Sequence, residues 1–123
     1  MICPYCFNEA EWVENKEVYG RNYGFHSVMI YLCRPCDAYV GCHKNTRKAL
    51  GTMANKELRA LRKQAHDIFD PLWLTNILFE HSDKKVRREK AYGLLRKNFG
   101  FDVHIGEADI ETCKKIIKFL KGR

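Results

Sequence analysis

The chain has 123 residues, of which 46% are hydrophobic and 30% are charged, and its formal net charge is +7. This length suits one modest core and excludes a long multidomain enzyme. The longest apolar stretch, SVMIYLC, is far shorter than the roughly 20 residues of a membrane-spanning helix. Because MICPYCFNEA has no basic segment followed by an apolar run, we expect no secretory signal and a reducing, cytoplasmic location.

The first predicted part, residues 1–50, is a zinc ribbon. The 26 residues between CPYC and CRPC leave room for a hairpin, with EAEWVENKEVYG as its weaker arm and SVMIYLC as its stronger arm. In the stronger arm Val28, Ile30 and Leu32 alternate with Met29 and Tyr31, which is the period of a strand. AYVGC is a candidate third strand.

The second predicted part, residues 51–123, is a bundle of about four helices. Asn55 is a candidate cap for a first helix, and Asp70 with Pro71 begins a second. Ser82 is a candidate cap for a third helix, which Gly100 ends. The segment DIETCKKIIKFL carries the apolar stripe of a fourth. We expect an α+β fold in which both parts pack as one compact unit.

Four cysteines have the spacing of a metal site. Cys3, Cys6, Cys33 and Cys36 form the pattern C-x2-C-x26-C-x2-C, in which two tight turns complete a tetrahedron of thiolates around one Zn2+. Redox or iron chemistry is the alternative. A zinc ion held by four thiolates has no open position at which to activate water. We therefore expect a structural site and no enzymatic activity.

Several motifs occur together in a known family. CPYC, YGRNYG, CRPCDAYVGCHKNT, LGTMANKELRALRKQAHDIFDPLW and HIGEADIETC follow one another through most of the chain. In this order they resemble an uncharacterised family of small bacterial and phage proteins with a zinc-finger-containing domain. The resemblance implies zinc on the paired CxxC motifs and a phage or prophage setting, with no assigned reaction. The sequence departs from the family pattern at Asp37, where a glycine is usual, and in its longer loop GFHSVMI.

Cys42 and His43 follow the second CxxC motif and have three possible roles. As neighbours on a strand they point to opposite faces, so Cys42 can be a buried thiol and His43 an exposed polar group. Alternatively, one of them is a replacement or fifth ligand of the first site. In the third interpretation they form a second mixed metal site with His104 and Cys113. Two zinc ions per chain would support the third interpretation.

The basic excess suggests an anionic partner, since residues 55–123 carry sixteen Lys and Arg against ten Asp and Glu. Aromatic rings can stack on bases while cations bind phosphate. The candidate nucleic-acid-binding residues are Tyr19, Arg21, Tyr23, Lys44, Arg47, Lys48, Arg59, Arg62 and Lys63. Local packing of the aromatic residues and ordinary solvated charge are the simpler explanations.

Our leading hypothesis is a non-enzymatic zinc-ribbon protein that binds nucleic acid. The alternative is an interaction module that engages or inhibits a host polymerase, nuclease or defence complex, with an exposed apolar patch around Trp12, Trp73 or Phe79. A ββα-metal nuclease is a weaker hypothesis. Such an enzyme needs a general base and metal ligands that include histidine, between or near the two CxxC motifs. The residues between the motifs contain only one histidine, His26, and His43 lies after the second motif.

Overall fold

The computed structural model describes residues 1–22, 28–75 and 83–122. The chain divides into two compact units, Met1–Arg59 and Ala60–Arg123. The sequence predicted a boundary at residue 50 between two parts that pack as one compact unit, and that packing stays a prediction. The boundary falls later because bridges from Cys42 to Ala49 and from Tyr39 to Ala54 attach the segment after β3 to the sheet.

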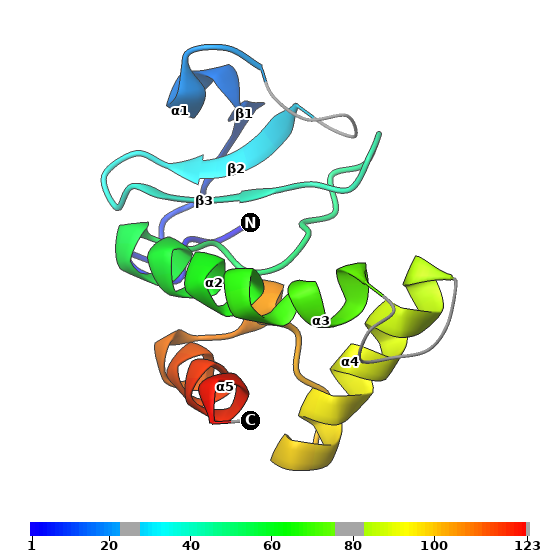
Figure 1. Cartoon of the computed structure of the whole chain (residues 1–123). Helices are drawn as coiled ribbons and strands as arrows, with labels where there is room; N and C mark the ends of the chain where they lie inside the picture. The colour runs from blue at the N-terminus through cyan, green and yellow to red at the C-terminus, as the bar shows by residue number, and fades with distance from the viewer. Residues whose placement is uncertain (23–27, 76–82, 123) are drawn as a thin grey trace. The chain divides into compact units, whose positions relative to one another are not determined.

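The elements confirm the predicted α+β class, and Figure 1 labels them. In chain order they are β1 (Glu11–Glu14), α1 (Lys16–Tyr19), β2 (Met29–Cys33), β3 (Ala38–Gly41), α2 (Lys56–Phe69), α3 (Pro71–Leu74), α4 (Lys84–Phe99), the 3-10 turn η1 (Ile105–Glu107) and α5 (Ile110–Lys121). No helix in residues 1–22, 28–75 or 83–122 is long and apolar enough to cross a membrane.

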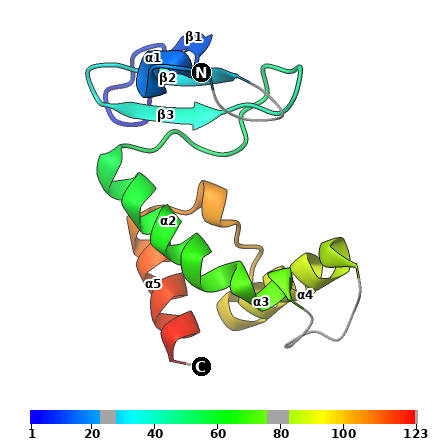
Figure 2. The ribbon, with the colours of Figure 1, turned by 45° about the horizontal axis from the view of Figure 1, so that its top comes forward.

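The first unit contains an antiparallel sheet in the order β1-β2-β3, whose strands Figure 2 labels. Ile30 faces Val13 on one side and Gly41 on the other, so β2 is the central strand. Ile30 and Leu32 are buried whereas Met29 and Tyr31 are half-buried, as the alternation in the sequence predicts. Val28 precedes the strand.

The weaker arm of the hairpin is shorter than predicted. It ends at Glu14, and the residues expected to extend it form the single helical turn α1. Gly20 ends that turn with φ 83°, a conformation that favours glycine, and its N–H donates to the Lys16 carbonyl. The expected hairpin tip includes Tyr23, which lies outside the described residues together with the rest of 23–27.

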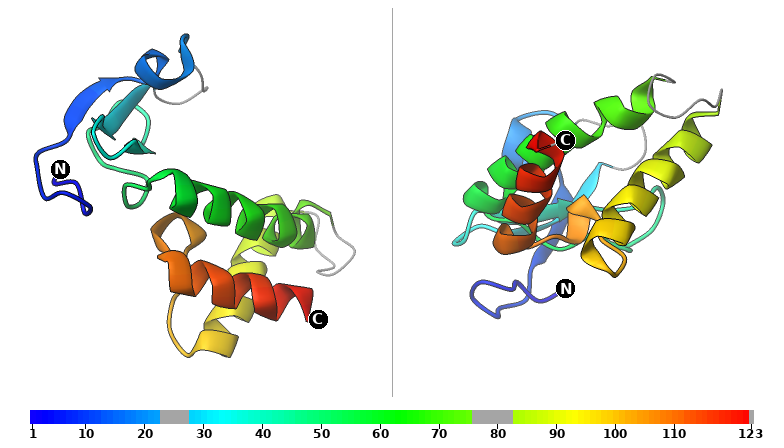
Figure 3. Two further views of the ribbon diagram at one scale, coloured as in Figure 1. Left: turned by 90° about the vertical axis from the view of Figure 1, so that its left-hand side faces the viewer. Right: turned by 60° about the horizontal axis from the view of Figure 1, so that its bottom comes forward.

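The second unit is helical, and α5 runs beside α2 in Figure 3. Its core includes Phe69, Leu95, Ile105 and Ile116, all fully buried. Arg87 is also buried, and its Nε donates to the Trp73 carbonyl at 2.9 Å, which joins α4 to α3. No sequence pattern marks this contact, because the partner of Arg87 is a main-chain oxygen outside its helix.

The helix ends follow the predicted signals at several places. Asn55 accepts a hydrogen bond from the Leu58 N–H at 3.1 Å, and Gly100 ends α4 with φ 81°. Asp70 precedes the short helix α3, but its side chain does not cap the helix and accepts from the Trp73 indole N–H at 3.1 Å instead. The cap of α4 is Asp83, whose side chain accepts from the Lys85 N–H. Ser82, the predicted cap, lies outside the described residues.

Candidate metal centre

Each CxxC motif forms a tight turn in the first unit. In the first turn the Phe7 N–H donates to the Cys3 carbonyl at 2.8 Å, and in the second the Asp37 N–H donates to the Arg34 carbonyl at 3.2 Å. Phe7 and Asp37 follow the last cysteine of each motif and have φ of 64° and 50°. This left-handed conformation favours glycine. Aspartate tolerates it better than most residues.

The two turns bring four sulfur atoms together. The Sγ atoms of Cys3, Cys6, Cys33 and Cys36 all lie within 4.8 Å of one another, and those of Cys6 and Cys33 are 3.6 Å apart. A tetrahedral zinc ion with bonds of about 2.3 Å requires sulfur atoms about 3.8 Å apart. The donor type, the donor number and the spacing therefore fit one zinc ion.

The cluster is also part of the core of the first unit. Cys3 and Cys33 are buried among Ala10, Ala38 and Met53, and the two other cysteines pack at its edge. Burial leaves little water to solvate a thiolate, so a cation is the natural counter-charge. A metal ion here would join the two turns through the interior of the unit.

The surroundings of Cys36 and Cys6 shift the pKa values of these two thiols in opposite directions. Burial raises the pKa of Cys36 to about 12, and hydrogen bonds with the other cysteines add to this effect. The Asn8 main chain, through a hydrogen bond, lowers the pKa of Cys6 to about 7, although burial opposes the change. Zinc binds thiolates, so metal binding must displace the protons of the less acidic cysteines.

Comparison with known proteins identifies the family of the chain. A family model described as a zinc-finger-containing domain matches residues 1–123. The chain belongs to this family. Its four-cysteine cluster supplies the site that a zinc-finger-containing domain requires. The searches of curated proteins and of solved structures found no match.

The residues of the proposed second metal site belong to two different units, so that site stays a prediction. Cys42 is buried and His43 is exposed in the first unit, whereas His104 and Cys113 belong to the second. Within the described residues, the four-cysteine cluster is the one group of three or more potential ligands. Cys113 is buried next to the Ala108 carbonyl, at 3.9 Å.

Three of the candidate nucleic-acid-binding residues lie together in the first unit. Lys44, Arg47 and Lys48 are exposed in residues 43–48, which we call the basic loop. Arg47 stacks over the ring of Trp12, with its guanidinium carbon 4.0 Å from the ring centroid. Sequence reasoning placed Trp12 in an apolar patch and missed this contact, because β1 and the basic loop are distant in the chain.

The other candidate cations make contacts inside the protein. Arg59 stacks on Tyr39 and binds the Ala54 carbonyl and the Asp37 carboxylate. Arg62 donates to the Ala108 carbonyl at 3.0 Å. Arg59, predicted to bind nucleic acid, therefore anchors the start of α2 in the first unit, and Arg62 connects elements of the second.

The remaining candidates are at the surface. Lys63 is exposed and pairs with Asp67 at 2.9 Å. Tyr19 is 48% exposed, and its hydroxyl donates to that of Tyr39 at 3.4 Å. Desolvation of the Tyr19 hydroxyl and its bond with Tyr39 raise the pKa of Tyr19 to about 12. Arg21 is exposed near α1.

Proposed function

We propose that this zinc-binding protein binds nucleic acid through the basic loop of its first unit. The observation that carries the proposal is a concentration of charge. Lys44, Arg47 and Lys48 lie within five positions, no acidic residue stands between Gly41 and Leu50, and all three side chains are exposed. Phosphate groups are bound by such cations, with release of counterions.

The surrounding charges leave these cations available. The ion pairs of the first unit join Glu9 to the N-terminus, Glu11 and Glu17 to Arg34, Glu14 to Lys16, and Asp37 to Arg59. Within the described residues, none of the three cations of the basic loop has a carboxylate partner. The loop is therefore the part of this unit where positive charge is least compensated.

The basic loop is held in one shape. The His43 N–H donates to the Lys48 carbonyl at 2.9 Å, and the Thr46 hydroxyl donates to the His43 carbonyl at 3.0 Å. The Tyr31 hydroxyl binds the Arg47 carbonyl from the central strand. A preorganised loop loses less entropy on binding than a flexible one. Contacts to phosphate would dominate, so we expect weak sequence preference.

The zinc site has a structural role in this proposal. Four thiolates fill a tetrahedral zinc ion and leave no position for water, which argues against metal-assisted hydrolysis. We propose that the protein is not an enzyme. All six cysteines are free thiols, which suits the reducing cytoplasm expected from the sequence. The phage or prophage setting implied by the family resemblance remains part of this proposal.

The salt dependence of binding tests the proposal. Fluorescence anisotropy with labelled duplex DNA, single-stranded DNA and RNA should show binding that weakens as salt increases. The double variant K44Q/K48Q should reduce the slope of log affinity against log salt by about 2 for duplex DNA, since each lost phosphate contact removes about 0.9. K56Q removes an exposed cation of the same unit outside the loop and should leave the slope unchanged. Absence of binding to all three probes at low salt would refute the proposal.

Exposed apolar side chains favour protein binding as a second candidate function. Ile2 and Phe7 are 53% and 77% exposed at the first knuckle, and the partly exposed Tyr5 lies between them. The sequence placed this patch at Trp12, Trp73 and Phe79. Trp12 and Trp73 are half-buried, and Phe79 lies outside the described residues. A stoichiometric host protein that survives nuclease treatment in a pull-down and is lost with I2S/F7S would establish this function.

A further inference from the structure

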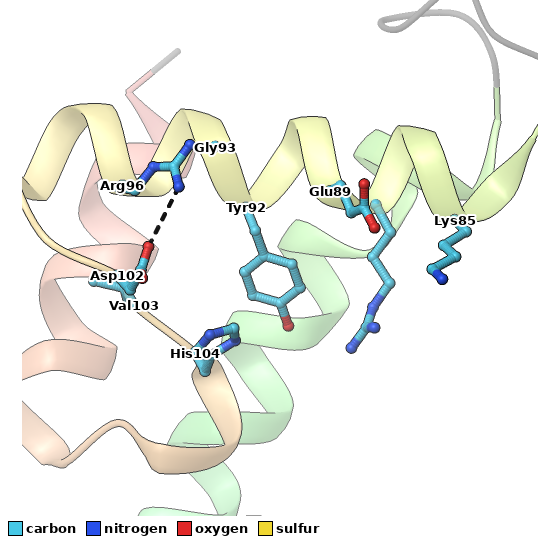
Figure 4. A pocket seen from close by; sticks show the side chains of 9 residues that line it. Lys85, Glu89, Tyr92, Gly93, Arg96, Asp102, Val103 and His104 are labelled. Carbon is cyan, nitrogen blue, oxygen red and sulfur yellow. Dashed lines mark ion pairs between the residues drawn. The ribbon is translucent and has the colours of Figure 1, made fainter.

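A pocket of about 470 Å³ lies in the second unit, outside the metal centre (Figure 4). One wall is a face of α4, because Lys85, Arg88, Tyr92 and Arg96 recur every three or four residues. The facing wall is the segment 102–104, which follows the left-handed turn at Gly100. The volume is typical of sites for small molecules.

Three cations and two carboxylates line the pocket, so its net charge is positive. Lys85 and Arg88 are exposed, and neither forms an ion pair with a carboxylate in the described part of the chain. Arg96 is 3.6 Å from Asp102 (dashed in Figure 4), so its charge is partly compensated. Glu89 is the other carboxylate of the lining. This balance favours a ligand with negative charge, and an arginine next to a lysine suits phosphate.

Aromatic rings stand beside these cations. The rings of Tyr92 and His104 approach each other across the pocket, with centroids 5.1 Å apart (Figure 4). Phe69 packs against Tyr92 at 4.7 Å and fixes its position from the core. His104 is exposed and lines the pocket, so its ring is available to a planar ligand.

Gly93 keeps the wall of the pocket open. Glycine is among the least favourable residues in a helix, yet Gly93 lies in the middle of α4. A Cβ atom at this position would meet no heavy atom within 4 Å. The helix therefore does not need glycine for packing at this position. Its effect is to leave free space between the cations and the rings.

We propose that this pocket binds a nucleotide, with its phosphate between Lys85 and Arg88 and its base stacked on His104. Glu89 is placed to accept a hydrogen bond from a ribose hydroxyl or a base amino group. The nucleotide is either free or the 5′-phosphorylated end of a strand, since both offer the same chemistry. The site belongs to the second unit and does not depend on the basic loop of the first.

Calorimetric titration of the full zinc-loaded chain tests the proposal. AMP should bind at least about tenfold more tightly than adenosine, which lacks the phosphate, and than ribose 5-phosphate, which lacks the base. A 5′-phosphorylated trinucleotide and its 5′-hydroxyl form distinguish the two sources. Tighter binding of AMP than of the phosphorylated trinucleotide indicates a free nucleotide, and tighter binding of the phosphorylated trinucleotide than of AMP indicates a strand end.

Substitutions locate the site. K85Q and R88Q should each weaken binding about tenfold, and G93L should abolish it by filling the pocket. K90Q removes a cation from the same helix outside the pocket lining and should change affinity less than about twofold. Circular dichroism shows whether G93L folds. If G93L is unfolded, the variants K85Q and R88Q, which change exposed residues, test the proposal instead.

The proposal would be overturned by two results. One is the absence of binding by AMP and by the phosphorylated trinucleotide at millimolar concentration. The other is wild-type affinity in K85Q and R88Q or in a folded G93L variant. The double variant K44Q/K48Q should retain AMP binding, so failure of the basic loop and failure of the pocket can be told apart.

Discussion

Removal of zinc should unfold the first unit and leave the second folded. Ile30, Leu32 and Met53 are large buried apolar side chains of the sheet and of the segment after it, and burial of each contributes about 1.5–3 kcal/mol. Structural zinc in small domains contributes about 10–16 kcal/mol at pH 7. The metal therefore contributes more than these three side chains together. The helices of the second unit have their own core, around Phe69, Leu95 and Ile116, and need no metal.

The fluorescence of the two tryptophans reports on the unfolding of each unit individually. Trp12 belongs to the first unit and Trp73 to the second, so the variants W73F and W12F each report on one unit. A strong chelator should shift the emission of Trp12 to longer wavelength and leave that of Trp73 unchanged. Far-UV circular dichroism should retain most of its helical signal. Unchanged Trp12 emission after verified metal removal would refute the reasoning, and so would simultaneous unfolding of both units.

Three further predictions concern the second unit, and thermal or urea unfolding followed by Trp73 emission measures each of them. D109A should destabilise α5 by about 1 kcal/mol because the Asp109 carboxylate caps this helix. The hydrogen bond from the Thr112 main chain lowers the pKa of the Asp109 carboxyl below 3.8. The stability that the cap contributes is therefore present above about pH 4 and is lost as the pH falls. A cap-preserving D109N should show little loss at pH 7. G93A should stabilise the unit by up to about 1 kcal/mol, whereas G100A, at φ 81°, should destabilise it by about 1–2 kcal/mol; equal effects would contradict the assigned conformations. R87M should cost about 1.5–3 kcal/mol by removing a buried charged donor, and R88M should cost much less.

The features that the sequence predicts correctly depend on residues close together in the chain. The Asn55 cap and the Gly100 helix end each require only neighbours within one helical turn. The alternation through Ile30 and Leu32 identifies the central strand. The paired CxxC motifs are also local signals, since each turn positions its own two sulfur atoms. A hairpin between the two motifs is then enough to bring all four sulfur atoms to one metal ion.

The features that the sequence misses depend on distant partners. Arg59, Arg62 and Arg87 look like surface cations, but each binds a main-chain carbonyl of another part of the chain, those of Asp37, Ala108 and Trp73. Every residue has a carbonyl, so no residue pattern marks these acceptors. The sequence does not reveal the proposed nucleotide pocket either, because its two walls come from different segments of the chain. It exists because the turn at Gly100 returns His104 to the face of α4.

The order of the metal ligands along the chain affects how the protein is made. All four cysteines precede residue 37, so during synthesis the zinc site leaves the ribosome before any residue of the second unit. Domains generally fold from the N-terminus as the chain emerges. The four thiols are then most open to oxidation in the nascent chain. The zinc supply during synthesis decides whether they bind metal or become oxidised. Cys113 emerges last and is shielded by helix packing alone.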